Sequence, residues 1–359
     1  MRTRHEVVAA GYGPPAHDGV PFVDLSTPPR SLVGRVLGLA RRLARDYEAV
    51  YWKHPANQAV LSRLRGVEAD AAIANDARAL PLAVALGLPV VFDAHEYAPD
   101  ELGEELWWRL ATRPLVRWQC REYIPRVAAM MTVSEGIAEA YERSYGVRPT
   151  VIPNSAPYAD LRPTEVQRPI RILHHGLAQR GRGLDEMVRM ADLLDDRFTL
   201  DFVLVDASRG YRRALQRHAA HNPRISFPPP VPMREIVQMA NGYDVGLFLL
   251  PPNNLNRRSA LPNKFFEFIQ GRLAIAIGPS PEMARLVRQY RCGVVAADFT
   301  PEALAAELNR LDAAQIAAFK RASHAAAAEL TAERDAASLL SLVEGALARR
   351  APRDPASLR

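Results

Sequence analysis

Short, continuous apolar segments alternate with helical patterns along most of this 359-residue chain. A strand covered on both faces reads as an unbroken apolar run, whereas a half-exposed strand alternates apolar and polar residues. Strands that alternate with helices are joined by crossovers and form parallel sheets. In the first half we predict strands at 6–10, 49–52, 71–74, 90–93 and 129–133, with helices that include 32–46 and 101–126.

The alternation stops once, near the middle, and then restarts. The sequence TVIPN at 150–154 is followed by the proline-rich stretch SAPYADLRPTEVQRP, which is typical of a linker. Beyond it we predict strands at 170–174, 200–205, 224–227, 245–250, 273–277 and 293–296, and a helix within 331–349. We therefore expect two doubly wound α/β domains in tandem, with a ligand in the cleft between them.

Composition narrows the class of protein. A hydrophobic content of 48% and a charged content of 24% are ordinary for a globular chain. The net charge of +6 suits nucleic acid, anionic lipid or phosphorylated substrates. Because no nucleic-acid motif is present, we expect no nucleic-acid partner. Cys120 and Cys292 give neither a disulfide framework nor a metal spacing, and no segment resembles a signal peptide or membrane span, so we expect a cytoplasmic protein.

The segment RRSALPNKFFEFIQGRLAIAI, residues 257–277, predicts a loop, a short helix, a glycine stop and a buried strand. Pro262 suits the first helical position, and Gly271 suits the residue after the last. Lys264 and Glu267 lie three residues apart within this helix. The free N–H groups of a helix start bind anions. A lysine there adds charge for a phosphate and a carboxylate accepts hydrogen bonds from sugar hydroxyls, a combination typical of a nucleotide-sugar site.

The segment ILHHGLAQRGRGLD, residues 172–185, predicts a strand, a basic turn and a helix that begins near Leu184. Gly176 allows a ligand to approach the backbone closely. Arg180 and Arg182 provide forked donors that suit a diphosphate. Taken by itself, the turn also fits a solvated basic surface.

The segment PVVFDAHEYAP, residues 89–99, predicts a buried strand with polar residues at its carboxyl end, where ligands of α/β proteins bind. We expect His95 to position an acceptor or transfer a proton, although a histidine after a strand is also often structural. Asp93 and Glu96 either orient it or cap the next helix. No further ligands with metal spacing follow, so we expect no metal site.

Together the three segments resemble retaining glycosyltransferases of family 4, which have the GT-B fold. The family's donor element is Glu-x7-Glu followed by glycine and a small-residue strand. Glu267 matches the second glutamate, and GRLAIAI matches the glycine and strand. The first glutamate would fall at Ser259, which puts its sugar-hydroxyl contacts in doubt. Arg182 takes the place of a family lysine, and Arg180 substitutes for a family arginine whose place Leu177 occupies.

The resemblance implies a domain plan. Residues 1–154 would form an acceptor-binding Rossmann-like domain, and residues 155–330 a nucleotide-sugar-binding one. Residues 331–350 would form a helix that crosses back to the first domain, and 351–359 a disordered tail. The chain starts at what resembles the family's second strand, so the first βα unit of the N-terminal domain is expected to be missing, which would expose sheet edges.

The resemblance also implies a retaining, metal-independent, hexosyltransferase-type reaction with a UDP- or GDP-sugar donor. The acceptor would be a glycan, a lipid-linked glycan or a small molecule. No cofactor and no protein nucleophile are expected. The residues assigned to catalysis are His95, Arg182 and Glu267, and those assigned to donor binding are Gly176, Arg180, Arg182, Asn263, Lys264 and Glu267.

Other functions stay open. Ser259 and the missing βα unit favour a non-catalytic sugar-nucleotide-binding subunit on the same fold. A sugar-nucleotide epimerase shares the fold but needs acid–base carboxylates that we cannot place. The basic stretches 32–45 and 107–126 suit either a solvated arginine face or an anionic membrane surface, the latter implying a peripheral position on the inner face of the plasma membrane.

Overall fold

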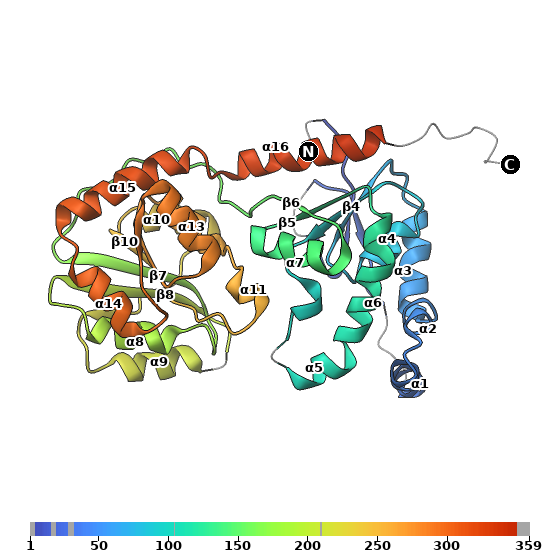
Figure 1. The fold of residues 1–359 in the computed structure, drawn as a ribbon, viewed down its shortest axis with the longest axis horizontal. Helices are drawn as coiled ribbons and strands as arrows, with labels where there is room; N and C mark the ends of the chain where they lie inside the picture. Colours follow the sequence, from blue (N-terminus) through green and yellow to red (C-terminus); the bar gives the residue numbers. More distant parts are fainter. Residues whose placement is uncertain (1–3, 16–18, 28–31, 104, 209, 350–359) are drawn as a thin grey trace. The chain divides into compact units, whose positions relative to one another are not determined.

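The computed structural model describes residues 4–15, 19–27, 32–103, 105–208 and 210–349. The chain divides into two compact units. Unit 1 takes its described residues from Met1–Val133, Ile137–Ile152 and Ala336–Arg359, and unit 2 consists of those in Ser134–Gly136 and Pro153–Asp335. Each unit has an α/β architecture, and every strand pair among the described residues is parallel, as predicted (Figure 1).

The described strands of unit 1 form two separate sheets. The smaller sheet pairs β1 (Ala9–Gly11) with β2 (Phe22–Asp24). The larger has the order β3 (Ala72–Asn75), β4 (Val90–Ala94), β5 (Ala129–Thr132), β6 (Thr150–Val151). The helices of this unit are α1 (Leu32–Leu43), α2 (Tyr47–Trp52), α3 (Pro55–Arg65), α4 (Leu80–Val84), α5 (Leu106–Ala111), α6 (Arg113–Tyr123) and α7 (Glu135–Tyr145). Short 3-10 turns lie at Ala98–Asp100 and Ile124–Arg126.

The continuous apolar sequence of β4 is explained by cover on both faces. Phe92 packs in the cluster that includes residues of α6 and α7. Its neighbour Val91 points the other way and packs against Val343 and Ala346 of the last helix, α16 (Ala332–Ala348). Because both faces are buried, no polar residue alternates along the strand until Asp93 at its carboxyl end.

The predicted strand at 49–52 is wrong, because these residues belong to α2. The Asp46 side chain caps this helix by accepting a hydrogen bond from Ala49 N at 3.1 Å. Tyr51 is then buried in a small cluster with residues of α3 and α4. A four-residue apolar run does not distinguish a buried helix from a strand. Among the described strands, the prediction missed β2 and β6, which are only three and two residues long.

Unit 2 is built on one six-stranded sheet. Its order is β12 (Gly293–Val295), β11 (Ala274–Ile277), β10 (Val245–Phe248), β7 (Ile170–Ala178), β8 (Phe198–Asp206), β9 (Ile225–Ser226). In chain order, the strands therefore proceed outward from β7 through β8 to β9 on one side, and from β10 through β11 to β12 on the other. The helices are α8 (Leu184–Asp192), α9 (Tyr211–Ala219), α10 (Ile236–Ala240), α11 (Leu255–Arg258), α12 (Asn263–Gln270), α13 (Pro281–Tyr290), α14 (Pro301–Asn309) and α15 (Ala313–Ala327).

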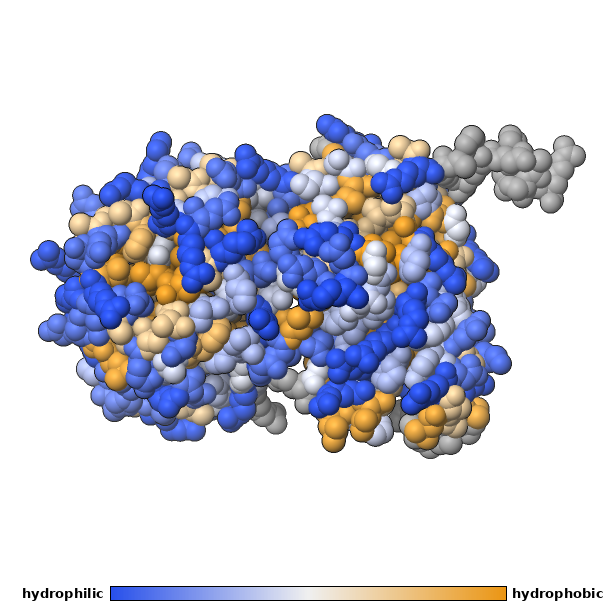
Figure 2. All heavy atoms as spheres, in the orientation of Figure 1, coloured by the Kyte–Doolittle hydropathy of each residue, from blue (hydrophilic) through white to orange (hydrophobic). Residues whose placement is uncertain are grey.

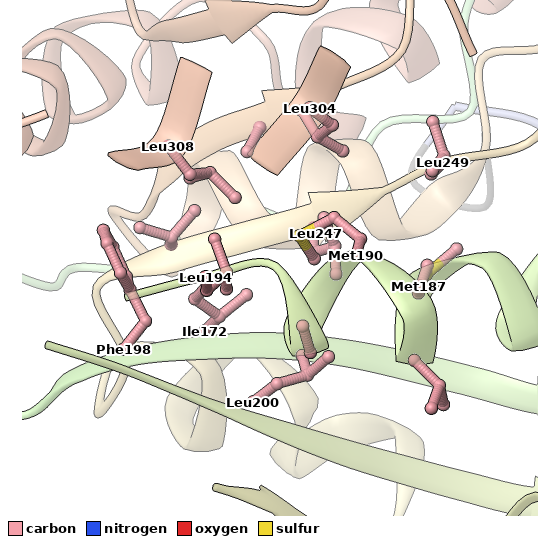
Figure 3. Packing of buried hydrophobic residues seen from close by; sticks show 14 of the residues in the cluster. Ile172, Met187, Met190, Leu194, Phe198, Leu200, Leu247, Leu249, Leu304 and Leu308 are labelled. Carbon is pink, nitrogen blue, oxygen red and sulfur yellow. The ribbon is translucent and has the colours of Figure 1, made fainter. Parts of the chain in front are cut away.

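One face of this sheet packs against α8 and α14 (Figure 3). The apolar residues of α8 recur at helical spacing, so that one side of the helix meets the strands. Burying each large side chain of this kind contributes about 1.5–3 kcal/mol. The packing holds β7, β8 and β10 in place and so positions their carboxyl ends. The residues labelled in Figure 3 are Ile172, Met187, Met190, Leu194, Phe198, Leu200, Leu247, Leu249, Leu304 and Leu308.

The helix predicted within 257–277 is α12, and its boundaries differ by one residue from the prediction. Pro262 is the N-cap rather than the first helical residue, so the helix starts at Asn263. Gly271 follows the last helical residue, as predicted. The helix predicted near Leu184 begins at that residue.

Three further predictions concern a membrane span, the C-terminal tail and the segment between the two halves of the chain. Among the described residues, none of the helices has both the length and the hydrophobicity needed to cross a membrane. The predicted tail at 351–359 lies outside the described residues. The segment 150–154, at which the alternation of the first half stops, begins with β6, which pairs with β5 at the edge of the larger sheet.

Candidate functional site

The point at which the strand order reverses in unit 2 lies between β7 and β10. These strands pair through Val245 with Ile172 and Gly246 with Leu173. At such a reversal the connections leave toward opposite faces of the sheet, and ligands bind in the crevice at the carboxyl ends of the strands. The residues just beyond these pairs are therefore the first place to look for a site.

His174 bridges the two strands immediately beyond the paired residues. Its Nδ1 lies 2.9 Å from the carbonyl oxygen of Leu247. Because a carbonyl only accepts hydrogen bonds, Nδ1 carries the proton and donates, and Nε2 is left as an acceptor. Burial holds the pKa of His174 well below its ordinary value, with the charge of Lys264 as the second cause, so the ring is neutral.

Lys264, in the first turn of α12, has its ammonium at the end of β7. Its Nζ lies 3.3 Å from His174 Nε2 and 5.2 Å from the centroid of the Phe248 ring. A Cβ at Gly176 would lie 3.0 Å from the same nitrogen, so glycine leaves the space that the lysine uses. Burial, and after it the charge of Arg182, lower the pKa of Lys264 to about 7, and the charge of Glu267 opposes both.

Glu267 lies one turn deeper in α12, next to the second histidine of β7. His175 Nε2 is 3.4 Å from Glu267 Oε2. Burial lowers the pKa of His175 to about 3, so the pair is a contact between a neutral ring and an acidic group rather than an ion pair. The geometry makes no hydrogen bond, and His175 Nε2 has no hydrogen-bond partner among the described residues. Burial raises the pKa of Glu267, and the Lys264 charge lowers it.

The turn from β7 to α8 carries the two arginines that the sequence singled out. Gly183 has a φ of +71°, and a Cβ there would lie 2.2 Å from the carbonyl oxygen of Leu249, so no side chain fits. The turn is thus packed against the end of β10. Arg182 is exposed, and its Nε donates to Gln179 Oε1 at 3.0 Å. Its charge also lowers the pKa of Lys264.

Arg180 faces a different neighbour. Its guanidinium lies 4.9 Å from the centroid of the Tyr211 ring, a cation–π contact. A third arginine, Arg257 of α11, was not predicted. Its Nη2 would lie 3.7 Å from a Cβ at Gly181, in the middle of the same turn. The residue was visible in the sequence, but the short helix that presents it, α11, was not recognised.

The remaining predicted residues of unit 2 lie at the start of α12 and before it. Asn263 is exposed and accepts a hydrogen bond from Asn154 Nδ2 at 3.0 Å. Ser259 ends α11 and is 5% exposed. The structure therefore groups Gly176, Lys264 and Glu267 closely, with Arg182 coupled to them through its charge, while Arg180 is turned toward α9.

His95 belongs to unit 1 and follows β4. Its Nε2 lies 3.0 Å from Asp93 Oδ2, and the imidazole is exposed while the carboxylate is buried. The hydrogen bond from this pair raises the pKa of His95, and burial opposes the rise. His95 therefore holds a proton at a higher pH than an ordinary histidine. Among the described residues, no group of three or more metal-ligating side chains is placed to hold a metal ion.

Comparison with known families identifies the first part of the chain. Residues 2–160 match the family described as Glycosyltransferase Family 4. No protein of curated function matches the sequence.

Comparison with solved structures identifies the fold. The chain is similar to an E. coli trehalose-6-phosphate protein bound with UDP-2-fluoro glucose, with a TM-score of 0.66, 12% identity, and coverage of 96% of this chain and 92% of that one. It is also similar to Anabaena HepE in complex with UDP and glucose, with a TM-score of 0.66, 13% identity, and coverage of 90% and 86%.

A third similar structure is S. aureus TarM, with a TM-score of 0.63 and 10% identity. The match covers 80% of this chain and spans 58% of TarM. At such identities the likeness concerns the fold. Residues 2–160 thus match the family that the sequence resembles, and the GT-B fold predicted from that resemblance is confirmed over most of the chain.

Proposed function

We propose that the protein transfers a sugar from a UDP- or GDP-sugar to a glycan, lipid-linked or small-molecule acceptor, with retention of the anomeric configuration. The observation that carries the proposal is the Lys264 ammonium beside Gly176 at the reversal of the strand order. Glu267 on the same helix and the arginine turn before α8 support it. Neighbours of the same fold that were solved with UDP add support for the nucleotide.

In this proposal the donor diphosphate lies at the carboxyl end of β7. The backbone near Gly176 is open to it, and Lys264 and Arg182 offer positive charge. As the bond from the sugar C1 to the phosphate oxygen breaks, negative charge develops on the leaving diphosphate, and fixed cations stabilise it. Arg180 contributes after leaving Tyr211, since a guanidinium fork binds two phosphate oxygens. Glu267 accepts hydrogen bonds from the ribose.

The acceptor oxygen then forms the new bond to C1 on the face that the diphosphate leaves. Its proton passes to the departing phosphate, so no protein nucleophile is required. We assign acceptor positioning to His95, whose pKa is raised by Asp93. Charge stabilisation is assigned to lysine and arginine, so the proposed reaction is independent of a metal ion.

Donor turnover tests this function. The full chain is incubated with UDP-glucose, UDP-N-acetylglucosamine and GDP-mannose, with and without glycan or lipid-linked acceptors, and released UDP or GDP is measured. We expect release from at least one donor, and a loss of at least about tenfold in Lys264→Ala and Glu267→Ala. Proton NMR of the product should show the donor's anomeric configuration. An inverted product would overturn retention.

A second candidate is a non-catalytic sugar-nucleotide-binding subunit. Ser259, buried where the family has a glutamate, favours it. Binding of UDP or GDP without release from any of the donors would support this alternative and contradict transfer. Absence of both binding and release would contradict both.

A membrane surface is part of the proposal, because α5 exposes large apolar residues. Leu106, Trp107 and Leu110 are 66–70% exposed. Arg42 of α1 donates to the last carbonyl of α5 at 3.5 Å, so the two helices meet at this point. Leu43, at the end of α1, is also exposed, and Figure 2 shows apolar side chains gathered over the tips of both helices. Arginines around apolar tips suit an anionic lipid surface, where a lipid-linked acceptor would be met.

Flotation with vesicles tests the membrane proposal. We expect recovery with phosphatidylglycerol-containing vesicles to exceed recovery with neutral phosphatidylcholine vesicles, and to fall in the double variant Trp107→Gln, Leu110→Gln. Met233→Gln is the matched control, because Met233 is an exposed apolar residue of unit 2. Equal recovery with both vesicle types would contradict the proposal.

A further inference from the structure

Lys264 of α12 contacts His174 of β7, although His174 lies on the face of the sheet that α12 does not cover. Successive residues of a strand point to opposite faces of the sheet. His175 contacts Phe268 of α12, with ring centroids 5.1 Å apart, and so lies on the face that α12 covers. Lys264, from the same helix, nevertheless contacts His174, which belongs to the other face. Gly176 allows this path, because a Cβ there would lie 3.0 Å from the lysine nitrogen.

The carbonyl oxygen of Leu247 fixes the direction of the hydrogen bond between Lys264 and His174. His174 Nδ1 donates to the Leu247 carbonyl at 2.9 Å, so Nε2 has no proton and accepts from Lys264 at 3.3 Å. The ring stays neutral because its burial opposes a charge. The lysine is therefore held in one place by a group that supplies no counter-charge.

The charged groups that face the lysine do not neutralise it. Arg182, from the turn after β7, repels the ammonium. Glu267, on α12 itself, attracts it. The two histidines of β7 are neutral. Among the described residues, no carboxylate lies within ion-pair distance of Lys264, and a half-buried cation without such a partner is poorly stabilised.

We propose that His174 is a positioning residue that holds Lys264 beside Gly176 without neutralising it, so that an incoming diphosphate supplies the counter-charge and draws a proton onto the lysine. This inference rests on the proposed function, because the anion is the diphosphate of the donor nucleotide. The proton comes from solvent and is released again when the nucleotide leaves.

The expected pH dependence of nucleotide affinity follows from the protonation of Lys264. Burial and Arg182 lower the pKa of Lys264 to about 7, so a growing fraction is unprotonated as pH rises above that value. A bound diphosphate favours the ammonium and raises the pKa. Between the pKa of Lys264 in the free protein and its raised pKa in the complex, nucleotide binding takes up one proton. In this range the affinity for the nucleotide falls by up to about tenfold for each pH unit.

Calorimetry on the full chain tests this coupling. UDP, or GDP if UDP does not bind, is titrated at pH 6 and pH 8, each in two buffers with different heats of ionisation. The dependence of the observed heat on the buffer gives the number of protons taken up. We expect about 0.9 proton at pH 8 and about 0.1 at pH 6, and an affinity that is several-fold weaker at pH 8.

Three variants separate positioning from simple packing. Lys264→Arg keeps the charge but does not titrate, so proton uptake should vanish at both pH values. In His174→Gln the amide oxygen takes the place of Nε2 and should preserve both affinity and uptake. His174→Phe keeps an aromatic ring beside Phe248 but loses the acceptor, and should weaken binding by at least about tenfold at pH 6. If His174→Phe does not fold, the other two variants still decide the question.

The results distinguish this inference from the function on which it rests. Nucleotide binding with equal affinity at both pH values and no proton uptake would overturn the inference and leave the donor site standing. Uptake that persists in Lys264→Arg would likewise overturn it. No binding of UDP or GDP at either pH would overturn the proposed function itself.

Discussion

The carboxyl ends of β4 and β7 carry the same residue type and give it opposite chemistry. In unit 1, His95 is exposed beside the Asp93 carboxylate, which raises its pKa. In unit 2, His174 and His175 are buried, and burial lowers the pKa of both. The first histidine is suited to hold a proton, whereas the other two are neutral groups that contact charged residues of α12.

This difference teaches that a histidine at a strand end indicates a site without indicating its role. The surroundings decide whether the ring carries charge. In unit 2 the positive charge belongs to Lys264 and to the arginines of the turn before α8. In unit 1 the positive charge can belong to His95. Variants near the carboxyl ends of β7 and β4 test the two environments separately, with the largest effect expected in unit 2 and the smallest in unit 1.

The largest effect is expected at the turn before α8. Gly183→Ala places a Cβ 2.2 Å from the Leu249 carbonyl oxygen, at a φ of +71°. Left-handed strain and the forced displacement together should cost about 2–5 kcal/mol. We expect a lower urea midpoint and a loss of UDP binding, because Arg182 moves with the turn.

The matched control is Gly87→Ala, in the turn that precedes β4 of unit 1. Gly87 has a φ of +70°, and nothing lies within 4 Å of a Cβ there. The cost should be only the strain of about 1–2 kcal/mol, with UDP binding unchanged. Equal losses in the two variants would contradict the tight packing of the turn against β10.

Acid should destabilise unit 2 through its histidines. The pKa of His175 is about 3 in the folded chain and near its ordinary value of 6.5 when unfolded. Below pH 6.5 the unfolded chain binds a proton that the folded chain does not, so stability falls as pH falls. The slope is about 1.4 kcal/mol for each pH unit from one such residue.

Urea unfolding between pH 7 and pH 4.5 measures this slope. His175→Gln removes a titrating group, and its stability should therefore depend less on pH than that of the wild type. An identical pH dependence in the variant would show that His175 is not held neutral in the folded chain.

The smallest structural change is expected in unit 1. Asp93→Asn removes the charge that faces His95, so the pKa of His95 should move down toward its ordinary value. Proton NMR of the imidazole follows this shift directly. A pKa for His95 that stays raised in the variant would show that Asp93 is not its cause.

Much of the fold follows from local patterns in the sequence. The continuous apolar run of β4, the periodicity of α8 and the glycine after α12 are readable because neighbours in sequence determine them. The strand predicted at 49–52 failed because a short apolar run fits a capped helix equally well. The three-residue strand β2 is too short to carry a period.

The sequence singles out several residues that the structure brings together, but it does not predict the contacts between them. Lys264 and Glu267 were recognised by their place in a helix. The partner of Lys264 is His174, which lies 90 positions earlier and on another element, and no periodicity relates the two. Arg257 approaches Gly181 only because α11 folds against the turn. Such contacts depend on tertiary packing, which is why they appear first in the structure.

The most direct test of the donor site is the calorimetric affinity for UDP at pH 6 in three variants, with GDP in its place if UDP does not bind. Glu267→Ala and Arg182→Ala should each weaken binding by about 1–3 kcal/mol, as expected for a lost charged hydrogen bond. His95→Ala, in unit 1, should leave the affinity unchanged. Unaltered affinity in both unit 2 variants would contradict a donor site at the junction of β7 and β10.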